Sequence, residues 1–117
     1  MRLSLVRHGE SKDKLTGVGT GQASCSGLSD RGVVQARTLA HRLRNSGELT
    51  DCHVLFSSPI LRAKQTAGVL IDVLPVDAFE EDHGLCEIHL GEGDGLTSKA
   101  YRAKFGKTTA PGGESWE

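Results

Sequence analysis

The sequence has 117 residues, of which 37% are hydrophobic and 25% are charged, and its net charge is -1. This length fits one domain with a modest core, and the composition is that of a folded protein rather than a disordered chain. A nearly neutral chain has no global field that attracts nucleic acid, so any anion binding must come from a local group of arginines or lysines. We therefore predict no nucleic-acid partner.

The three cysteines, Cys25, Cys52 and Cys86, form no CxxC pair, and their odd number excludes a complete set of disulfides within the chain. A reducing cytosol is the simpler interpretation. The apolar run before Arg7 is too short for a signal peptide, and no later segment approaches the roughly 20 apolar residues of a membrane span. We predict a soluble, cytoplasmic protein with no membrane partner.

The first predicted element is a strand from Leu3 to Val6, a short run of branched apolar residues that breaks at Gly9, as a buried parallel strand does. Its C-terminal end delivers Arg7 and His8. Residues 12–27 show no apolar period but many glycines, serines and threonines, which predicts a long loop of the kind that lines a site.

A helix is predicted from an N-cap at Ser29 to a stop at Gly47, followed by a strand over 53–57 and a second helix that begins with Ser58 and Pro59. The order strand, helix, strand, helix favours a parallel sheet with helices on its faces. Ligands of such sheets bind beyond the C-terminal ends of the strands. Residues at those ends are therefore the first candidates for a site.

After Pro75 the pattern weakens into an acidic stretch over 77–82, a glycine-rich turn over 91–95 and a short helix over 98–105. The run 110–117 is interpreted as a turn leading into a further helix. We expect one domain over residues 1–117 that lacks an element at its C-terminal end.

Three side chains carry the candidate chemistry. His8 follows the first strand beside Arg7, and a neutral imidazole can attack phosphorus. Arg62 lies in the first turn of a helix, where free N–H groups and the helix dipole favour an anion. Glu87 can protonate a departing alkoxide if partial burial raises its pKa. Each residue alone also fits an ordinary role: a histidine that caps a sheet, a surface arginine and a solvated glutamate.

Five blocks of sequence give these residues a common context. In their order and spacing, over nearly the whole chain, the blocks resemble the histidine-phosphatase (phosphoglycerate-mutase-like) superfamily. They are Arg7 to Ser11, Gly27 to Gly32 with Gln35 and Ala36, Ser57 to Ala67, Leu85 to Thr97, and Pro111 to Ser115.

This resemblance implies a three-layer α/β fold with a parallel sheet, and a reaction that needs no cofactor and no metal. It assigns His8 as the nucleophile, Arg7 and Arg62 as clamps on the phosphoryl oxygens, and Glu87 as the proton donor. The substrate-binding residues expected from it are Glu10, Ser11, Lys14 and Gly21. Members of the family often carry Asn at the position of Lys14 and an aromatic residue at that of Gly93, so substrate contacts there are open.

The family's second catalytic histidine lies on a later strand, and no histidine follows His89 in this sequence. The resemblance therefore implies an incomplete phosphate pocket and an incomplete fold. For this chain it implies an activity about 100-fold or more below that of a complete relative, since one oxyanion donor is absent. We also expect another copy, in a homo-oligomer, or relocated segments of the chain to cover the sheet edge left exposed.

Mutases of the superfamily show a Glu-Arg-His-Tyr-Gly type of segment, whereas this sequence reads Glu87-Ile88-His89-Leu90-Gly91. The similarity therefore favours the phosphatase branch, and we predict hydrolysis of small phosphorylated metabolites through a phosphohistidine on His8. Two alternatives stay open: a catalytically weakened module that binds phospho-ligands, and a phosphotransferase of the phosphoglycerate-mutase type.

Two other motifs compete with this interpretation. The run 17–21 is rich in glycine, but it lacks an adjacent strand, a third glycine at the required offset and a Gly-Lys-Ser/Thr ending, so we discard a nucleotide loop. The spacing of His83, Cys86 and His89 is compatible with a metal site to which Glu87 adds an oxygen, although no second group of ligands supports it.

Overall fold

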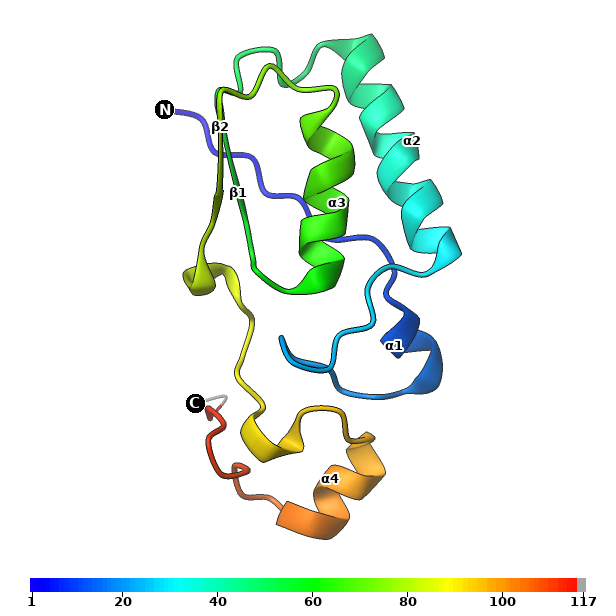
Figure 1. Cartoon of the computed structure of the whole chain (residues 1–117), viewed down its shortest axis with the longest axis vertical. Helices are drawn as coiled ribbons and strands as arrows, with labels where there is room; N and C mark the ends of the chain where they lie inside the picture. Colours follow the sequence, from blue (N-terminus) through cyan, green and yellow to red (C-terminus); the bar gives the residue numbers. More distant parts are fainter. Residues whose placement is uncertain (116–117) are drawn as a thin grey trace.

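A computed structural model describes residues 1–115 of the chain. Its helices are α1 (Lys12–Thr16), α2 (Asp30–Ser46), α3 (Leu61–Ile71) and α4 (Ser98–Phe105), its strands are β1 (Val54–Ser57) and β2 (Ala78–Glu81), and two single turns of 3-10 helix are η1 (His83–Leu85) and η2 (Gly91–Gly93) (Figure 1). None of the helices in the described part of the chain is both long enough and apolar enough to cross a membrane.

The sheet consists of β1 and β2, which run parallel with Val54 opposite Ala78 and Ser57 opposite Glu81. Helix α3 connects the two strands and packs on β1, and α2 packs on α3. The elements therefore follow one another as sheet, α3, α2, with both helices on the same side (Figure 1). This is a mixed α/β fold with parallel strands, but residues 1–115 do not build the third layer that the sequence led us to expect.

The predicted strand from Leu3 to Val6 is wrong for this structure. The segment is extended, yet it has no ladder with β1, and side-chain bonds from Arg2 to the backbone and side chains of the 48–51 turn anchor its start. Leu3 and Leu5 are 76% and 85% exposed. An all-apolar strand is stable only when neighbours pair with its backbone and cover both of its faces, and the described residues supply neither.

Two helix predictions are confirmed at both ends. Helix α2 begins after Ser29, whose Oγ accepts a hydrogen bond from Gly32 N at 3.0 Å, and it ends at Gly47, whose φ of 68° is left-handed. Helix α4 covers the predicted range, and Thr97 caps its start by accepting from Ala100 N. Side-chain capping chemistry that is local in sequence determines both starts.

Three boundaries differ from the prediction. Helix α3 begins at Leu61 rather than at Pro59, because Ser58 Oγ accepts from Ile60 N and closes a separate turn before the helix. The loop 12–27 contains α1, and the acidic stretch 77–82 contains β2, which its ladder with β1 stabilises in spite of its charge. The further helix expected at the end of the run 110–117 involves residues 116–117, which lie outside the described residues.

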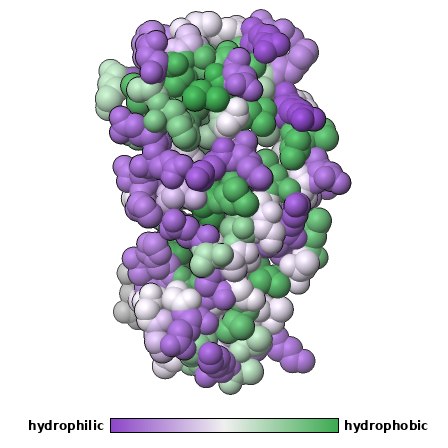
Figure 2. Space-filling view, in the orientation of Figure 1, coloured by the Kyte–Doolittle hydropathy of each residue, from purple (hydrophilic) through white to green (hydrophobic). Residues whose placement is uncertain are grey.

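The buried core is small and lies mainly between α2 and α3. It is formed by Ala40, Leu43 and Leu70, against which six partly buried residues pack: Leu39, Leu49, Leu55, Val69, Val73 and Leu74. The radius of gyration is 16.2 Å, against about 13 Å for a compact chain of this length. On the face drawn in Figure 2 the larger apolar patches lie over the half of the molecule that holds the sheet and α3.

Candidate active site

The His8 ring is fixed by a hydrogen bond at each nitrogen. Its Nδ1 lies 2.7 Å from the Gly9 carbonyl oxygen, and its Nε2 lies 3.1 Å from Nε of Arg62. A carbonyl can only accept and a guanidinium can only donate, so Nδ1 carries the proton and Nε2 presents its lone pair. The ring is therefore held in the tautomer in which Nε2 is the free nucleophilic atom, and a cation lies directly beside it.

Arg62 is the second residue of α3, as predicted, and a loop holds the other end of its guanidinium. Nη1 donates to the carbonyl oxygen and to the hydroxyl of Thr20, each at 3.2 Å, and lies 3.5 Å from Cys25 Sγ. No side chain caps α3. The guanidinium places N–H donors and a positive charge next to Nε2 of His8, and this position is called the cradle, since it suits an anion.

Asp13, on α1, fixes the loop 17–27 that contains Thr20. Its carboxylate accepts from the hydroxyl of Thr20 at 3.0 Å and from both the backbone N and the hydroxyl of Ser26, at 3.0 and 2.8 Å. Burial raises the pKa of Asp13, but the hydrogen bonds from Ser26 and Thr20 together outweigh it and keep the pKa below its ordinary value. The carboxylate is therefore ionised inside the loop.

Asp94 holds the tip of the same loop from the other side. Its carboxylate accepts from Gly21 N at 2.7 Å, from Ala23 N at 3.3 Å and from the hydroxyl of Ser24. A Cβ at Gly21 would lie 2.7 Å from an Asp94 oxygen, so a glycine is required there by close approach. The two aspartates together fix the loop 17–27, which forms one wall of the site.

The backbone around His8 packs tightly against both helices. Gly9 N donates to the hydroxyl of buried Thr66 on α3, which in turn donates to the Arg62 carbonyl. A Cβ at Gly9 would meet the Gly32 carbonyl oxygen at 2.5 Å. The glycine after His8 therefore lets α2 approach this backbone closely.

The other predicted site residues lie in different surroundings. Arg7, Lys14 and Glu87 are exposed, and their side chains have no hydrogen bond or ion pair with another described residue. Glu10 Oε1 accepts from the hydroxyl of Ser29 at 2.9 Å, which links it to the start of α2. Ser11 is buried and caps α1. The space beside Gly21 is occupied by the carboxylate of Asp94, which accepts from Gly21 N. The substrate-binding roles of Glu10, Ser11, Lys14 and Gly21 and the clamp role of Arg7 stay predictions.

Glu87 lies on a segment that is anchored near the start of α3. Sγ of its neighbour Cys86 lies 3.4 Å from the hydroxyl of Ser58. Ser58 belongs to the turn that precedes α3. Among residues 1–115 no three His, Cys, Asp or Glu side chains are arranged to hold a metal ion, so the spacing of His83, Cys86 and His89 does not form a centre there.

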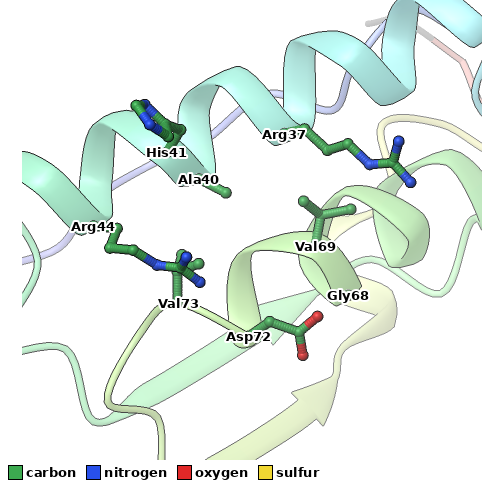
Figure 3. Close-up of a pocket in the computed structure, with 8 residues that line it drawn as sticks. All are labelled: Arg37, Ala40, His41, Arg44, Gly68, Val69, Asp72 and Val73. Atoms are coloured by element: carbon green, nitrogen blue, oxygen red, sulfur yellow. The ribbon is translucent and has the colours of Figure 1, made fainter.

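A second concave surface lies between α2 and α3. It has a volume of about 410 Å³ and is lined by Arg37, His41 and Arg44 from α2 and by Asp72, the C-cap residue of α3 (Figure 3). It shares no residue with the site around His8. Both surfaces hold a histidine near a guanidinium, and at His8 the guanidinium donates directly to the imidazole nitrogen.

Comparison with known proteins assigns the chain to a family. The model of the histidine phosphatase superfamily (branch 1) matches residues 3–117. The chain belongs to this superfamily. Two of its histidine-phosphatase relatives are 2,3-bisphosphoglycerate-dependent phosphoglycerate mutases from Allorhizobium ampelinum and from Chelativorans sp. (strain BNC1). Each is 33% identical over 97% of this chain, which covers 58% and 60% of the two relatives.

Two solved structures are also similar to the chain. A mycobacterial glucosyl-3-phosphoglycerate phosphatase in complex with VO3 superimposes with a TM-score of 0.71 at 28% identity, over 93% of this chain and 54% of that chain. A protein described as mycobacterial hydrolase 1 gives a TM-score of 0.73 at 27% identity, with the same coverage. The chain thus spans little more than half the length of these relatives, which include both mutases and phosphatases.

The residues that fix the loop 17–27, one wall of the site, were not predicted from the sequence. Asp13, Thr20 and Asp94 make side-chain bonds that connect positions up to 73 residues apart, and only the fold brings such pairs together. Gly32 was seen as part of a family block but not as the surface against which Gly9 packs. No local signal in the sequence distinguishes Asp13 from a solvated aspartate in a loop.

Proposed function

We propose that His8 is the nucleophile of a phosphomonoesterase reaction on small phosphorylated metabolites. In the first step Nε2 attacks the phosphorus, the N–P bond forms, and the P–O bond to the ester oxygen breaks. The leaving alkoxide takes a proton from Glu87. In the second step water attacks the phosphohistidine, gives its proton to Glu87 and releases inorganic phosphate, which restores the free imidazole.

The charged groups near His8 have distinct tasks in this reaction. The hydrogen bond from Nδ1 to the Gly9 carbonyl fixes the tautomer in which Nε2 carries the lone pair, and it stabilises the positive charge that develops on the ring as the N–P bond forms. Nε of Arg62 exchanges its bond to Nε2 for one to a phosphoryl oxygen, and Arg7 adds a second guanidinium. Positioning and charge stabilisation account for most of the catalysis.

The observation that supports this function most directly is the 3.1 Å contact between Arg62 Nε and His8 Nε2, with Nδ1 already paired. The test is hydrolysis of p-nitrophenyl phosphate by the wild type and by His8→Ala. His41→Ala, at an exposed histidine of α2, is the matched control. We expect the rate to fall to background only in His8→Ala, together with the loss of an acid-labile phosphoryl group detected by mass spectrometry. Equal rates in all three proteins would contradict hydrolysis.

Two other functions have specific support. The 33% identity to phosphoglycerate mutases favours transfer between positions of phosphoglycerate, which interconversion of 3- and 2-phosphoglycerate in the presence of 2,3-bisphosphoglycerate would reveal. The exposed, unpaired Arg7 and Glu87 favour a module that binds phospho-ligands without turnover. Calorimetric binding of inorganic phosphate without any hydrolysis would identify that module.

A further inference from the structure

Asp13 is a buried, ionised carboxylate with no part in the proposed chemistry. It is 7% exposed and has no basic side chain as a hydrogen-bond or salt-bridge partner among the described residues. Its partners are the hydroxyl of Thr20, the backbone N and hydroxyl of Ser26, and the thiol of Cys25. These donors belong to the loop 17–27, and Asp13, on α1, connects its parts at Thr20 and Ser26.

The Thr20 hydroxyl links Asp13 to the cation of the site, and the thiol of Cys25, which also bonds Asp13 and lies 3.5 Å from Arg62 Nη1, forms a second link beside it. A hydroxyl has one proton, and here that proton is donated to Asp13 Oδ2. The lone pairs of the oxygen are left to accept from Arg62 Nη1 at 3.2 Å. An acceptor-only carboxylate thus fixes the direction in which the hydroxyl points. Without it, the hydroxyl is free to rotate and to present its proton toward the guanidinium.

The Thr20 contacts leave the reactive side of Arg62 free. Nη1 is held by the carbonyl and the hydroxyl of Thr20, while Nε faces His8. When an anion enters, Nε must leave Nε2 and turn to it, and Nη1 can stay in place as the pivot. The accuracy of that movement depends on how firmly Thr20 is held.

We propose that Asp13 is a positioning residue for phosphotransfer: through Thr20 it holds the Arg62 guanidinium beside Nε2 of His8. The role of the site rests on the function proposed above, whereas the positioning itself is a property of the chain without ligand. Asn is a poor substitute at Asp13, since its amide N–H groups would face donors from Ser26 or Thr20.

The experiment compares Asp13→Asn, Thr20→Val and the double variant with the wild type. Three quantities are measured: the hydrogen exchange rate of the Arg62 Nε–H by NMR, the affinity for inorganic phosphate by calorimetry, and the melting temperature. We expect each single variant to raise the exchange rate and to weaken phosphate binding, both by about tenfold, which is the effect of one lost charge-assisted hydrogen bond. The double variant should be no worse than Asp13→Asn, because the Thr20 contact is one of those that Asp13 orders.

Two further variants complete the test. Asp82→Asn removes an exposed aspartate that only caps η1 by accepting from Gly84 N, so Arg62 and phosphate binding should not change. Thr20→Ser keeps the hydroxyl and should restore wild-type exchange, and it still tests the link if Asp13→Asn does not fold. The proposal is overturned if Asp13→Asn lowers only the melting temperature, or if the two single effects add. A wild type that binds no phosphate would refute the proposed function, and Arg62 exchange would still decide the positioning.

Discussion

The loop around Arg62 and the sheet differ in how far folding satisfies their side chains. In the loop the carboxylates of Asp13 and Asp94 accept from backbone N–H groups and hydroxyls. No buried side-chain nitrogen or oxygen in residues 1–115 is unsatisfied. In the sheet Phe56 is 53% exposed, and in the extended segment before Arg7, which does not pair with β1, Leu3 and Leu5 are more exposed still. Individual hydrogen bonds determine the conformation of the loop, whereas an apolar sheet is stabilised only when other elements cover both of its faces. The site can therefore be well ordered while the sheet is not covered.

The largest effect is expected where α2 packs on the backbone that follows His8. Gly32→Ala places a Cβ against the backbone N and carbonyl oxygen of Glu10, with the nitrogen at 2.9 Å. Alanine favours helices, so propensity alone predicts a gain in stability. We expect instead a loss of about 1–3 kcal/mol in the free energy of unfolding, from overpacking against backbone that cannot move aside.

The matched control for that substitution is Gly68→Ala on α3. No atom lies within 4 Å of a Cβ built there, and the residue is exposed. This substitution should stabilise the protein by about 0.5–1 kcal/mol. Urea denaturation measures both. Equal shifts in the two variants would mean that α2 does not pack closely on the segment after His8.

The next effect concerns the guanidinium itself. Arg62→Lys keeps the charge but places its donors on one nitrogen, so it cannot reproduce the planar fork whose Nε and Nη1 face His8 and Thr20. We expect the affinity for inorganic phosphate to fall by about tenfold or more, measured by calorimetry. Arg42→Lys, at an exposed arginine paired with Glu48, is the control and should leave phosphate binding unchanged. Equal losses in both would indicate non-specific binding to the basic face of α2.

A third prediction concerns the uncovered sheet. If other copies of the chain cover its apolar surface, sedimentation should show association that increases with concentration, and Leu3→Ser with Leu5→Ser should reduce it. Val34→Ser, at an apolar residue of α2 that is also exposed, is the control and should not change it. A compact monomer at all concentrations would exclude a homo-oligomer as the cover.

The sequence predicted what depends on neighbours along the chain. The caps of α2, the range of α4, the strand at β1 and the position of Arg62 in the first turn of α3 follow from local signals, and the order of the family blocks identified the superfamily. The strand from Leu3 to Val6 was predicted from its apolar residues alone. Its failure to pair reflects surroundings that no local pattern contains.

The candidate site divides in the same way. His8 and Arg62 were predicted because their residue types carry chemistry at strand and helix ends, and the structure brings them within 3.1 Å. Asp13 and Asp94 were missed because their importance comes from burial and from partners distant in sequence. A long polar loop in a sequence indicates where a site lies, but the carboxylates that order such a loop emerge only from its fold.

The smallest effect is the pH dependence of the Asp13 contribution to stability. The folded pKa of Asp13 lies below the ordinary value of 3.8, so the ionised form is favoured by folding. Its contribution is fully present well above pH 3.8 and is lost as the pH falls through the folded pKa. The difference in unfolding free energy between the wild type and Asp13→Asn should therefore be constant near neutral pH and shrink below about pH 4.

Salt separates this buried contribution from a surface one. Arg42 lowers the pKa of exposed Glu48 in the same direction, so Glu48→Gln has the same sign of pH dependence. Screening by high salt should remove the Glu48 effect, because that pair lies in water, and should leave the Asp13 effect, because its partners are neutral donors within the loop. An Asp13 difference that disappears with salt would mean that the carboxylate acts as a surface charge and that the loop does not depend on it.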